Sequence, residues 1–213
     1  EDGIRVVERS RGLGDVYKRQ IYHVRFRLCD SIPAGIRSDL MDEKRRLLTI
    51  VSKDKALSVA EKRRLLRLYS HRVEEVLDRG YGSCWLGREP VAKLMARTLR
   101  FFEGERYELY AWCVMPNHVH SVVRPFEGIE LSKILHSWKS YTSNKANEML
   151  GRRGSFWQKE SFDRIIRDHE DLVRVIGYVY ANPDKAGLKD WKWRYRSLEA
   201  IEPNGPTAGS SWH

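Results

Sequence analysis

The sequence predicts an α+β fold, in which an antiparallel sheet carries helices on one face. Four segments have strand character: 21–33, 106–115, 118–125 and 154–168. Four others place apolar residues at helical spacing: 37–79, 90–104, 130–150 and 169–182. Their order is close to the ferredoxin-like βαββαβ pattern, with extra helices after the first strand and one at the end.

The first strand is expected in "IYHVRFRLCDSIP" (21–33), where polar and apolar residues alternate. One face of this strand carries Tyr22, Val24, Phe26 and Leu28. This pattern indicates a half-buried strand, which ends before Pro33.

A helical insertion is expected at 37–89, between the first strand and the helix that begins at Pro90. Ser58 and Glu61 have the spacing of a capping box, so a helix should begin there. Gly80 stands where a helix C-cap belongs, and Pro90 suits the first turn of the next helix.

The two central strands should form a hairpin, because Pro116-Asn117 between them is a tight-turn signal. After the following helix and strand, Asp168 can cap the last helix. That helix is expected to stop near Pro183, since proline lacks the amide that continues a helix.

The length of 213 residues suits one domain, expected at 21–201. Residues 1–20 contain "SRGLGDVYKRQ", which resembles translated sequencing-adapter read-through, so they are set aside as non-native sequence. The polar segment 202–213 is expected to be a flexible tail.

The composition favours a folded protein with a polyanionic partner. Hydrophobic residues make up 41% of the chain, aromatic residues 11%, and the formal net charge is +10. That charge is typical of proteins that bind nucleic acid. The alternative is a soluble basic protein whose charge only keeps it dispersed.

The three cysteines are widely spaced and form no CxxC pair, which favours a reducing cytoplasm over an oxidising compartment. The apolar runs are too short for a membrane span, and nothing resembles a secretory signal. We therefore expect a cytoplasmic protein without a membrane partner.

The segment "AWCVMPNHVHSVV" (111–123) holds the first candidate site. Side chains alternate along a strand, so His118 and His120 share one face while Val119 points to the other. Two imidazoles at this spacing can hold one divalent ion, but further ligands must come from elsewhere. A pair of hydrogen-bonded structural histidines is the alternative.

The last helix carries the second candidate site. Tyr178 and Asn182 are four residues apart and share a helix face, whereas Tyr180 lies on another. If this helix packs beside the histidine strand, Asn182 can supply a third metal ligand and Tyr178 a nucleophilic hydroxyl. Alternatively, Tyr178 is an ordinary core residue and Asn182 a helix-end residue.

Together these motifs resemble a known family. "VMPNHVHSVV" resembles the HUH motif of single-tyrosine HUH transposases, and "YVYANPDKAGL" resembles their tyrosine helix. "KSYTSNKANEMLGRRGSFWQKESFDRIIRD" is similar to the intervening segment of the REP-associated tyrosine transposases. The resemblance extends from about Ile21 to Trp193 and implies a ferredoxin-like HUH-endonuclease core.

The resemblance also implies a function. In that family single-stranded DNA is cleaved and rejoined through a 5′-phosphotyrosine with Mg²⁺ or Mn²⁺, at REP-type palindromic hairpins in a bacterial cell. Tyr178 matches the nucleophile, and His118, His120 and Asn182 match the metal ligands. Val179 departs mildly from the isoleucine that is usual after the tyrosine. The oligomeric state is left open between monomer and homodimer, and a DNA-bound protein would be nucleoid-associated.

Basic and aromatic residues of the second half of the chain are candidate DNA contacts. They are Lys139, Tyr141, Arg152, Arg153, Lys159 and Arg164. Arg152 and Arg153, in a glycine-flanked turn, are the preferred phosphate contacts. The alternative is that most of these side chains form a solvated surface.

Two further functions remain open for such a chain. One is a hairpin-DNA-binding protein that has lost catalytic activity, although a pure binder does not need all of His118, His120, Tyr178 and Asn182. The other is a replication-initiator or relaxase-like HUH nickase, which the match around "NPDKAGL" disfavours.

Overall fold

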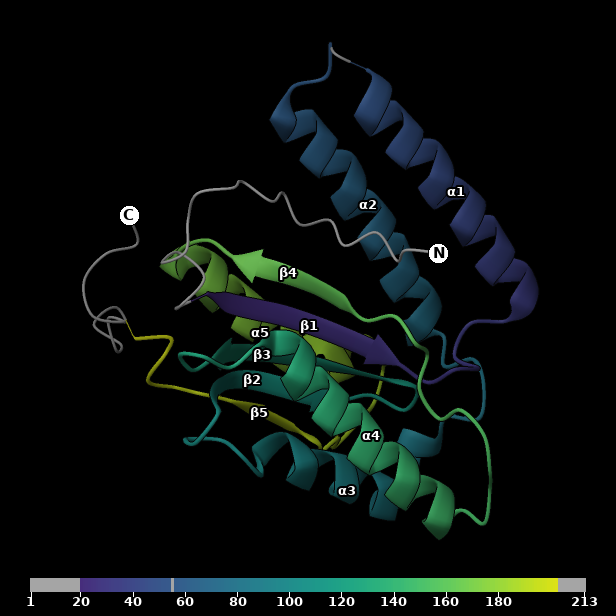
Figure 1. Cartoon of the computed structure of the whole chain (residues 1–213), viewed down its shortest axis with the longest axis vertical. Coiled ribbons are helices and arrows are strands. Elements are labelled where there is room, and N and C mark those ends of the chain that lie inside the picture. Colours follow the sequence, from purple (N-terminus) through teal and green to yellow (C-terminus); the bar gives the residue numbers. More distant parts are fainter. Residues whose placement is uncertain (1–19, 55, 203–213) are drawn as a thin grey trace.

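The computed structural model describes residues 20–54 and 56–202, and its centre is a five-stranded antiparallel sheet (Figure 1). The strand order is β4-β1-β3-β2-β5. The strands are β1 (Ile21–Arg27), β2 (Tyr107–Val114), β3 (His118–Pro125), β4 (Phe162–Ile166) and β5 (Arg194–Arg196). The helices are α1 (Ala34–Lys53), α2 (Val59–Asp78), the short 3₁₀ helix η2 (Trp85–Gly87), α3 (Glu89–Arg100), α4 (Leu131–Met149) and α5 (His169–Lys185).

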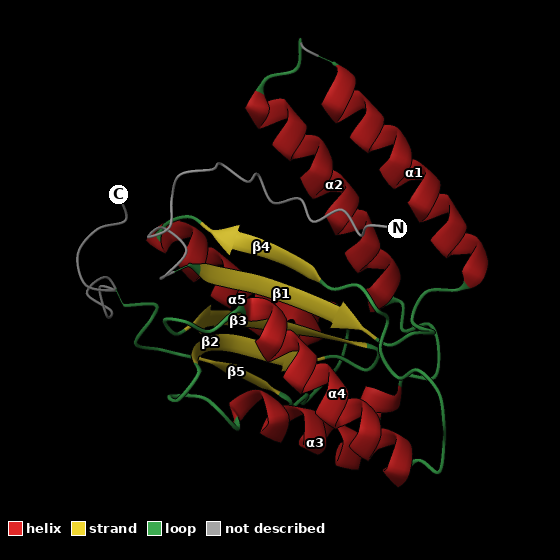
Figure 2. Ribbon diagram, in the orientation of Figure 1, coloured by secondary structure: helices red, strands yellow, loops and turns green. Residues whose placement is uncertain are grey.

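The predicted α+β class is confirmed, and the first four strands have the 4-1-3-2 order of a ferredoxin-like core. The helices, however, cover both faces of the sheet and not one. Figure 2 shows α3 and α4 in front of the sheet and α5 behind it. The difference arises because β1 and β3 are buried on both faces, so a second layer is needed.

The α3/α4 face holds the larger apolar core, centred on Trp138. The Trp138 indole donates to the Tyr107 hydroxyl at 2.9 Å, and that hydroxyl donates to the Leu99 carbonyl at 2.8 Å. Every polar group of the two rings is thus satisfied inside the core. The predicted apolar face of β1 is confirmed, since Val24 and Phe26 are buried in this core.

The opposite face of β1 differs from the half-buried strand expected. His23 and Arg25 are 5% and 6% exposed. They are buried because α5 and the C-terminal end of α2 lie over this face. Tyr178 of α5 contacts His23, and Glu74 of α2 contacts Arg25. Polar side chains buried in this way need partners, and those partners form the candidate site.

The helical insertion forms an α1–α2 hairpin, which extends away from the sheet (Figure 1). The capping box is confirmed: the Glu61 amide donates to Ser58 Oγ at 3.2 Å and the Ser58 amide to Glu61 Oε2 at 2.8 Å. Gly80 ends the hairpin with a φ of +70°. The chain then turns back toward the sheet, which brings the last turns of α2 beside β1.

The strand expected at 154–168 is limited to β4, Phe162–Ile166. Before β4, Phe156 and Trp157 insert into the core, and the Lys139 ammonium donates to the carbonyls of Gln158 and Lys159 at 2.7 and 2.8 Å. A side chain therefore satisfies carbonyls that a neighbouring strand would otherwise bind. The short edge strand β5 was not expected, because three residues are too few to show a period.

The last helix begins as predicted, since the Asp171 amide donates to Asp168 Oδ1 at 2.7 Å. It does not stop before Pro183 but runs on to Lys185. Proline is tolerated here because it removes a single donor in the last turn. Amides after Pro183 still make hydrogen bonds to the helix. Ala186 N donates to Asn182 O at 3.1 Å, and Leu188 N donates to Pro183 O at 2.9 Å.

Candidate active site

The β2–β3 turn fixes the orientation of His118. His118 Nδ1 lies 2.7 Å from Asn117 Oδ1, and the Asn117 amide nitrogen donates to the carbonyls of Leu77 and Tyr81 at 3.0 and 3.2 Å. Because an amide oxygen only accepts, His118 Nδ1 carries the proton and Nε2 carries the lone pair. Asn117 thereby holds the imidazole in the tautomer that binds metals through Nε2.

His120 has a similar partner on the neighbouring strand. Its Nδ1 lies 3.1 Å from His23 Nε2, and the two rings stack with centroids 5.3 Å apart. The His118 and His120 ring centroids are 4.9 Å apart. The Nε2 atoms of both His118 and His120 are buried and have no hydrogen-bond partner. Two adjacent unpartnered nitrogens are what a buried metal site requires of its imidazoles.

The electrostatics favour neutral imidazoles. Burial, with a smaller contribution from the Arg25 guanidinium, lowers the pKa of His23 and of His118 to about 3. Burial and then the neighbouring histidines lower the pKa of His120 well below its usual value. All three rings are therefore neutral at physiological pH, and neutral imidazole is the form that binds metal ions.

Tyr178 of α5 lies against His120 and His23. Its ring centroid is 5.9 Å from that of His120 and 6.1 Å from that of His23. Its hydroxyl donates to Glu74 Oε2 of α2 at 2.5 Å. Burial raises the pKa of the Tyr178 phenol, and the Glu74 carboxylate raises it further, so the hydroxyl keeps its proton at neutral pH.

Tyr180 lies elsewhere, as its place on the helix predicted. The guanidinium carbons of Arg194 and Arg196 lie 4.6 and 4.3 Å from the centroid of its ring. Both arginines belong to β5, at the edge of the sheet. Of the two phenols, Tyr178 is the one that faces the histidines.

Asn182 lies one helical turn after Tyr178 and is only 1% exposed. Its amide nitrogen is buried without a hydrogen-bond partner. A half-turn of the amide exchanges nitrogen and oxygen, which offers a metal-binding oxygen at the same point. Within the described part of the chain, no group of three or more His, Cys, Asp or Glu side chains is arranged to hold a metal ion. A site with two histidines therefore needs a ligand of another kind, such as this amide.

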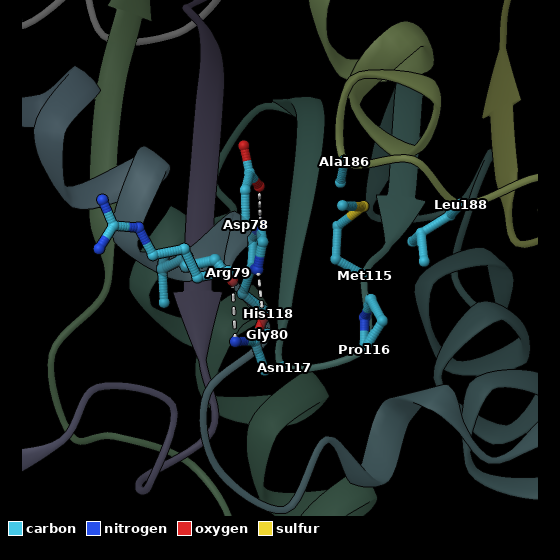
Figure 3. Close-up of a pocket in the computed structure, with 10 residues that line it drawn as sticks. Asp78, Arg79, Gly80, Met115, Pro116, Asn117, His118, Ala186 and Leu188 are labelled. Atoms are coloured by element: carbon cyan, nitrogen blue, oxygen red, sulfur yellow. Dashed lines mark hydrogen bonds and ion pairs between the residues drawn. The ribbon is translucent and has the colours of Figure 1, made fainter.

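A pocket of about 220 Å³ opens beside His118, between the end of α2, the β2–β3 turn and the end of α5 (Figure 3). Asp78 Oδ1 in this pocket lies 4.0 Å from His118 Nε2. Burial and then the charge of Glu74 raise the pKa of Asp78 to about 6. The residues that line the pocket are Leu77, Asp78, Arg79, Gly80, Met115, Pro116, Asn117, His118, Ala186 and Leu188.

The sequence patterns missed three residues of this site: His23, Glu74 and Asp78. Glu74 and Asp78 are four residues apart, so they were recognisable as two carboxylates on one face of α2. Nothing local places that face against Tyr178, which is 104 residues away from Glu74 in the sequence. His23 alternates with the apolar face of β1, and its burial depends on the helix layer behind the sheet.

Of the six predicted DNA contacts, Arg164 lies apart from the other five, which belong to α4 and the segment after it. Arg164 lies on the α5 side, where its guanidinium bonds Asp171 at 2.7 Å. Lys139 and Tyr141 lie on α4, whose apolar side packs on the opposite face of the sheet. Tyr141 is 53% exposed, and Arg153 and Lys159 are exposed. Arg152 donates to the Ser155 carbonyl at 3.2 Å. Their contact with DNA stays a prediction.

Known proteins resemble this chain in the same region. Residues 80–181 match the family model described as "Transposase IS200 like". A REP-associated tyrosine transposase of Haemophilus influenzae is 27% identical over 101 residues, which cover 41% of this chain and 57% of the relative. That of Escherichia coli is 27% identical over 89 residues, covering 40% and 52%. The chain thus spans just over half the length of these curated relatives.

A solved structure also resembles the chain, with a TM-score of 0.46 and 16% identity, over 80% of this chain and 70% of the other. That structure is described as a REP-associated tyrosine transposase bound to a REP hairpin.

The segment that matches the family model contains the histidine strand and most of the tyrosine helix. This match is a similarity to the IS200-like transposases over just under half of the chain, in the region whose motifs indicated that class. The two curated relatives are both named as REP-associated tyrosine transposases, the group that the motifs resemble. Among the helices of the described residues, none is long and apolar enough to cross a membrane.

Proposed function

We propose that this protein cleaves and rejoins single-stranded DNA through a covalent 5′-phosphotyrosine on Tyr178. The observation that carries the proposal is the contact of Tyr178 with His120, whose Nε2 atom is buried and unpartnered, as is that of the adjacent His118. A phenol beside a pair of metal-binding nitrogens is suited to nucleophilic phosphoryl transfer. The relationship to tyrosine transposases supports the same chemistry.

His118, His120 and Asn182 would hold the metal ion, Mg²⁺ or Mn²⁺. Their fit to such an ion rests on the unpartnered atoms His118 Nε2, His120 Nε2 and Asn182 Nδ2, all of them buried. A divalent ion bound there would polarise the scissile phosphodiester and neutralise the charge that develops on it.

The chain's own residues supply the nucleophile and its positioning. Tyr178 Oη attacks the phosphorus, and the bond from phosphorus to the 3′ oxygen breaks, leaving a 3′ hydroxyl and a 5′-phosphotyrosine. One phosphate ester bond, to Tyr178, forms for the one that breaks. A 3′ hydroxyl can therefore attack the phosphotyrosine and rejoin the strands. Asn117 and His23 hold the two imidazoles in orientation through their Nδ1 atoms.

Palindromic hairpin DNA of the REP type is the proposed substrate. Both curated relatives carry the words REP-associated in their names. The formal net charge of +10 suits a polyanionic partner, and exposed Arg153 and Lys159 are available for phosphates. The protein would act as a monomer or homodimer.

The test is covalent capture of labelled hairpin oligonucleotides on a denaturing gel with Mg²⁺ or Mn²⁺. The wild type should form a protein–DNA adduct that a chelator abolishes. Tyr178→Phe should lose the adduct, and Tyr180→Phe should keep it as the matched control. Loss in Tyr180→Phe alone would assign the reaction to the other phenol. Tight, salt-sensitive hairpin binding with no adduct from any protein would favour a DNA-binding protein without catalysis.

A further inference from the structure

We propose that Glu74, on the α1–α2 hairpin, is a catalytic residue that accepts the proton of the Tyr178 hydroxyl during cleavage. This inference rests on the proposed role of Tyr178 as the nucleophile. It assigns the insertion a direct part in the chemistry, in addition to its structural contacts with the sheet.

Each oxygen of the Glu74 carboxylate has its own partner. Oε2 accepts from the Tyr178 hydroxyl at 2.5 Å, within the reach of a proton transfer. Oε1 lies 2.8 Å from an Arg25 guanidinium nitrogen. The Glu74 and Arg25 side chains are only 14% and 7% exposed, so little water competes for these contacts.

Arg25 is the residue that orients the Glu74 carboxylate toward the phenol. It lies on β1 directly opposite His120 of β3, in the centre of the sheet. Its positive charge compensates the buried negative charge of Glu74. The base is therefore anchored on the same rigid sheet as the histidines, although it is carried by the insertion.

The other polar groups near Tyr178 are engaged differently or accept no proton. The Lys185 ammonium lies 4.7 Å from the centroid of the Tyr178 ring and has no lone pair to accept one. The ring nitrogens His23 Nε2 and His120 Nδ1 bond each other at 3.1 Å. Asp78 Oδ1 faces His118 Nε2, at 4.0 Å. Glu74 is the group to which the phenol already donates its hydrogen bond.

The proton balance of the step is simple. Tyr178 Oη forms a bond to phosphorus while its proton moves to Glu74 Oε2. The bond to the 3′ oxygen breaks and leaves its electron pair on that oxygen, which takes a proton from water. Glu74 then returns its proton to the hydroxide so formed. In the rejoining direction the attacking 3′ hydroxyl loses its proton through water to Glu74, and Glu74 Oε2 gives a proton to the departing Tyr178 phenolate.

The decisive variant is Glu74→Gln, which keeps the size and a hydrogen-bonding oxygen but accepts no proton. We expect the single-turnover rate of adduct formation to fall by about 10²- to 10⁴-fold, the usual range for a general base. Hairpin affinity, measured by fluorescence anisotropy, and the melting temperature should stay close to wild type. Glu75→Gln is the matched control, since Glu75 is the next residue of α2, is 60% exposed and pairs with His71.

A second measurement separates proton transfer from simple support of Tyr178. Replacing Tyr178 with a more acidic fluorinated tyrosine makes the base less necessary. This replacement should restore much of the rate lost in Glu74→Gln, whereas a purely structural defect would persist.

The outcomes of the two tests are distinct. A Glu74→Gln protein that cleaves within a few-fold of wild type, or a slow one that the acidic phenol does not rescue, overturns the inference and leaves Tyr178 as nucleophile. If the Tyr178→Phe protein forms the adduct as the wild type does, the proposed function is overturned, and the role of Glu74 with it.

Discussion

At the scale of single residues, the site is defined by buried polar atoms that the fold leaves without protein partners. His118 and His120 each use Nδ1 for a hydrogen bond and leave Nε2 unpartnered. An unsatisfied buried polar atom costs about 1–3 kcal/mol, so a ligand that binds these two nitrogens would remove that cost.

The partners of the two Nδ1 atoms should affect metal affinity. Loss of such an outer partner typically weakens binding by about 10- to 100-fold. We expect His23→Ala and Asn117→Ala to weaken Mn²⁺ binding by this factor, and Asn182→Ala to weaken it at least as much. Mn²⁺ titration followed by electron paramagnetic resonance checks this, with exposed His136→Ala on α4 as the control. Unchanged affinity in all three variants would refute the assigned ligand set.

The buried histidines also predict acid sensitivity of the metal-free protein. The pKa of His23 and His118 is about 3 in the folded state against 6.5 for an ordinary histidine, so between these values the unfolded chain binds more protons. Stability must therefore rise with pH across this window and fall on acidification. From pH 7.5 to 5.5 each histidine should cost about 1.4 kcal/mol.

Asp78, with a pKa near 6, acts in the opposite direction, because its folded form gains a proton before its unfolded form does. The net effect is measured by urea unfolding with chelator present. A free energy of unfolding that is flat between pH 7.5 and 5.5 would contradict neutral, buried histidines.

At the scale of elements, the loop after α2 decides how the insertion meets the sheet. Gly82 has a φ of +87°, and a Cβ there would lie 2.5 Å from the backbone oxygen of Asp30. The Ser83 amide next to it donates to Asp30 Oδ2 at 2.9 Å. This close approach fixes the end of the hairpin that carries Glu74 and Asp78.

Gly82→Ala should therefore destabilise the protein by about 1–3 kcal/mol, through backbone strain and the clash with Asp30. Gly35→Ala is the control, because nothing lies within 4 Å of a Cβ at Gly35 in α1. That change should stabilise by about 0.4–1 kcal/mol. Thermal unfolding of both variants tests these two expectations. Equal melting temperatures would argue against the close approach of Gly82 to the Asp30 backbone.

At the scale of the whole molecule, the excess positive charge predicts salt-dependent DNA binding. Each phosphate contact contributes a slope of about −1 to the plot of log affinity against log salt. Arg153→Ala should reduce the magnitude of this slope by about 1 and weaken all hairpins alike. Lys145→Ala is the control, since Lys145 is already paired with Glu148 at 2.8 Å. Anisotropy titrations from 50 to 200 mM salt give both slopes; identical slopes would remove Arg153 from the DNA contacts.

The sequence by itself determined the order of the helices and of the first four strands, and much of the local geometry. Strand alternation placed His118 and His120 on one face and Val119 on the other, and helical spacing separated Tyr178 from Tyr180. The caps at Ser58 and Asp168 were also predictable. These features depend on neighbours a few residues apart, so periodicity reports them.

Only the tertiary structure decided what surrounds the tyrosine. Glu74 is hydrogen-bonded to Tyr178, which is 104 residues away in the sequence, and His23 to His120, which is 97 residues away. The placement of α5 on the second face of the sheet, which buries both pairs, also lies outside local periodicity. Such contacts are set by how layers pack and where the insertion returns to the sheet, and the same local pattern is compatible with several packings. Residues that appear to belong to a surface helix thus become part of the candidate site.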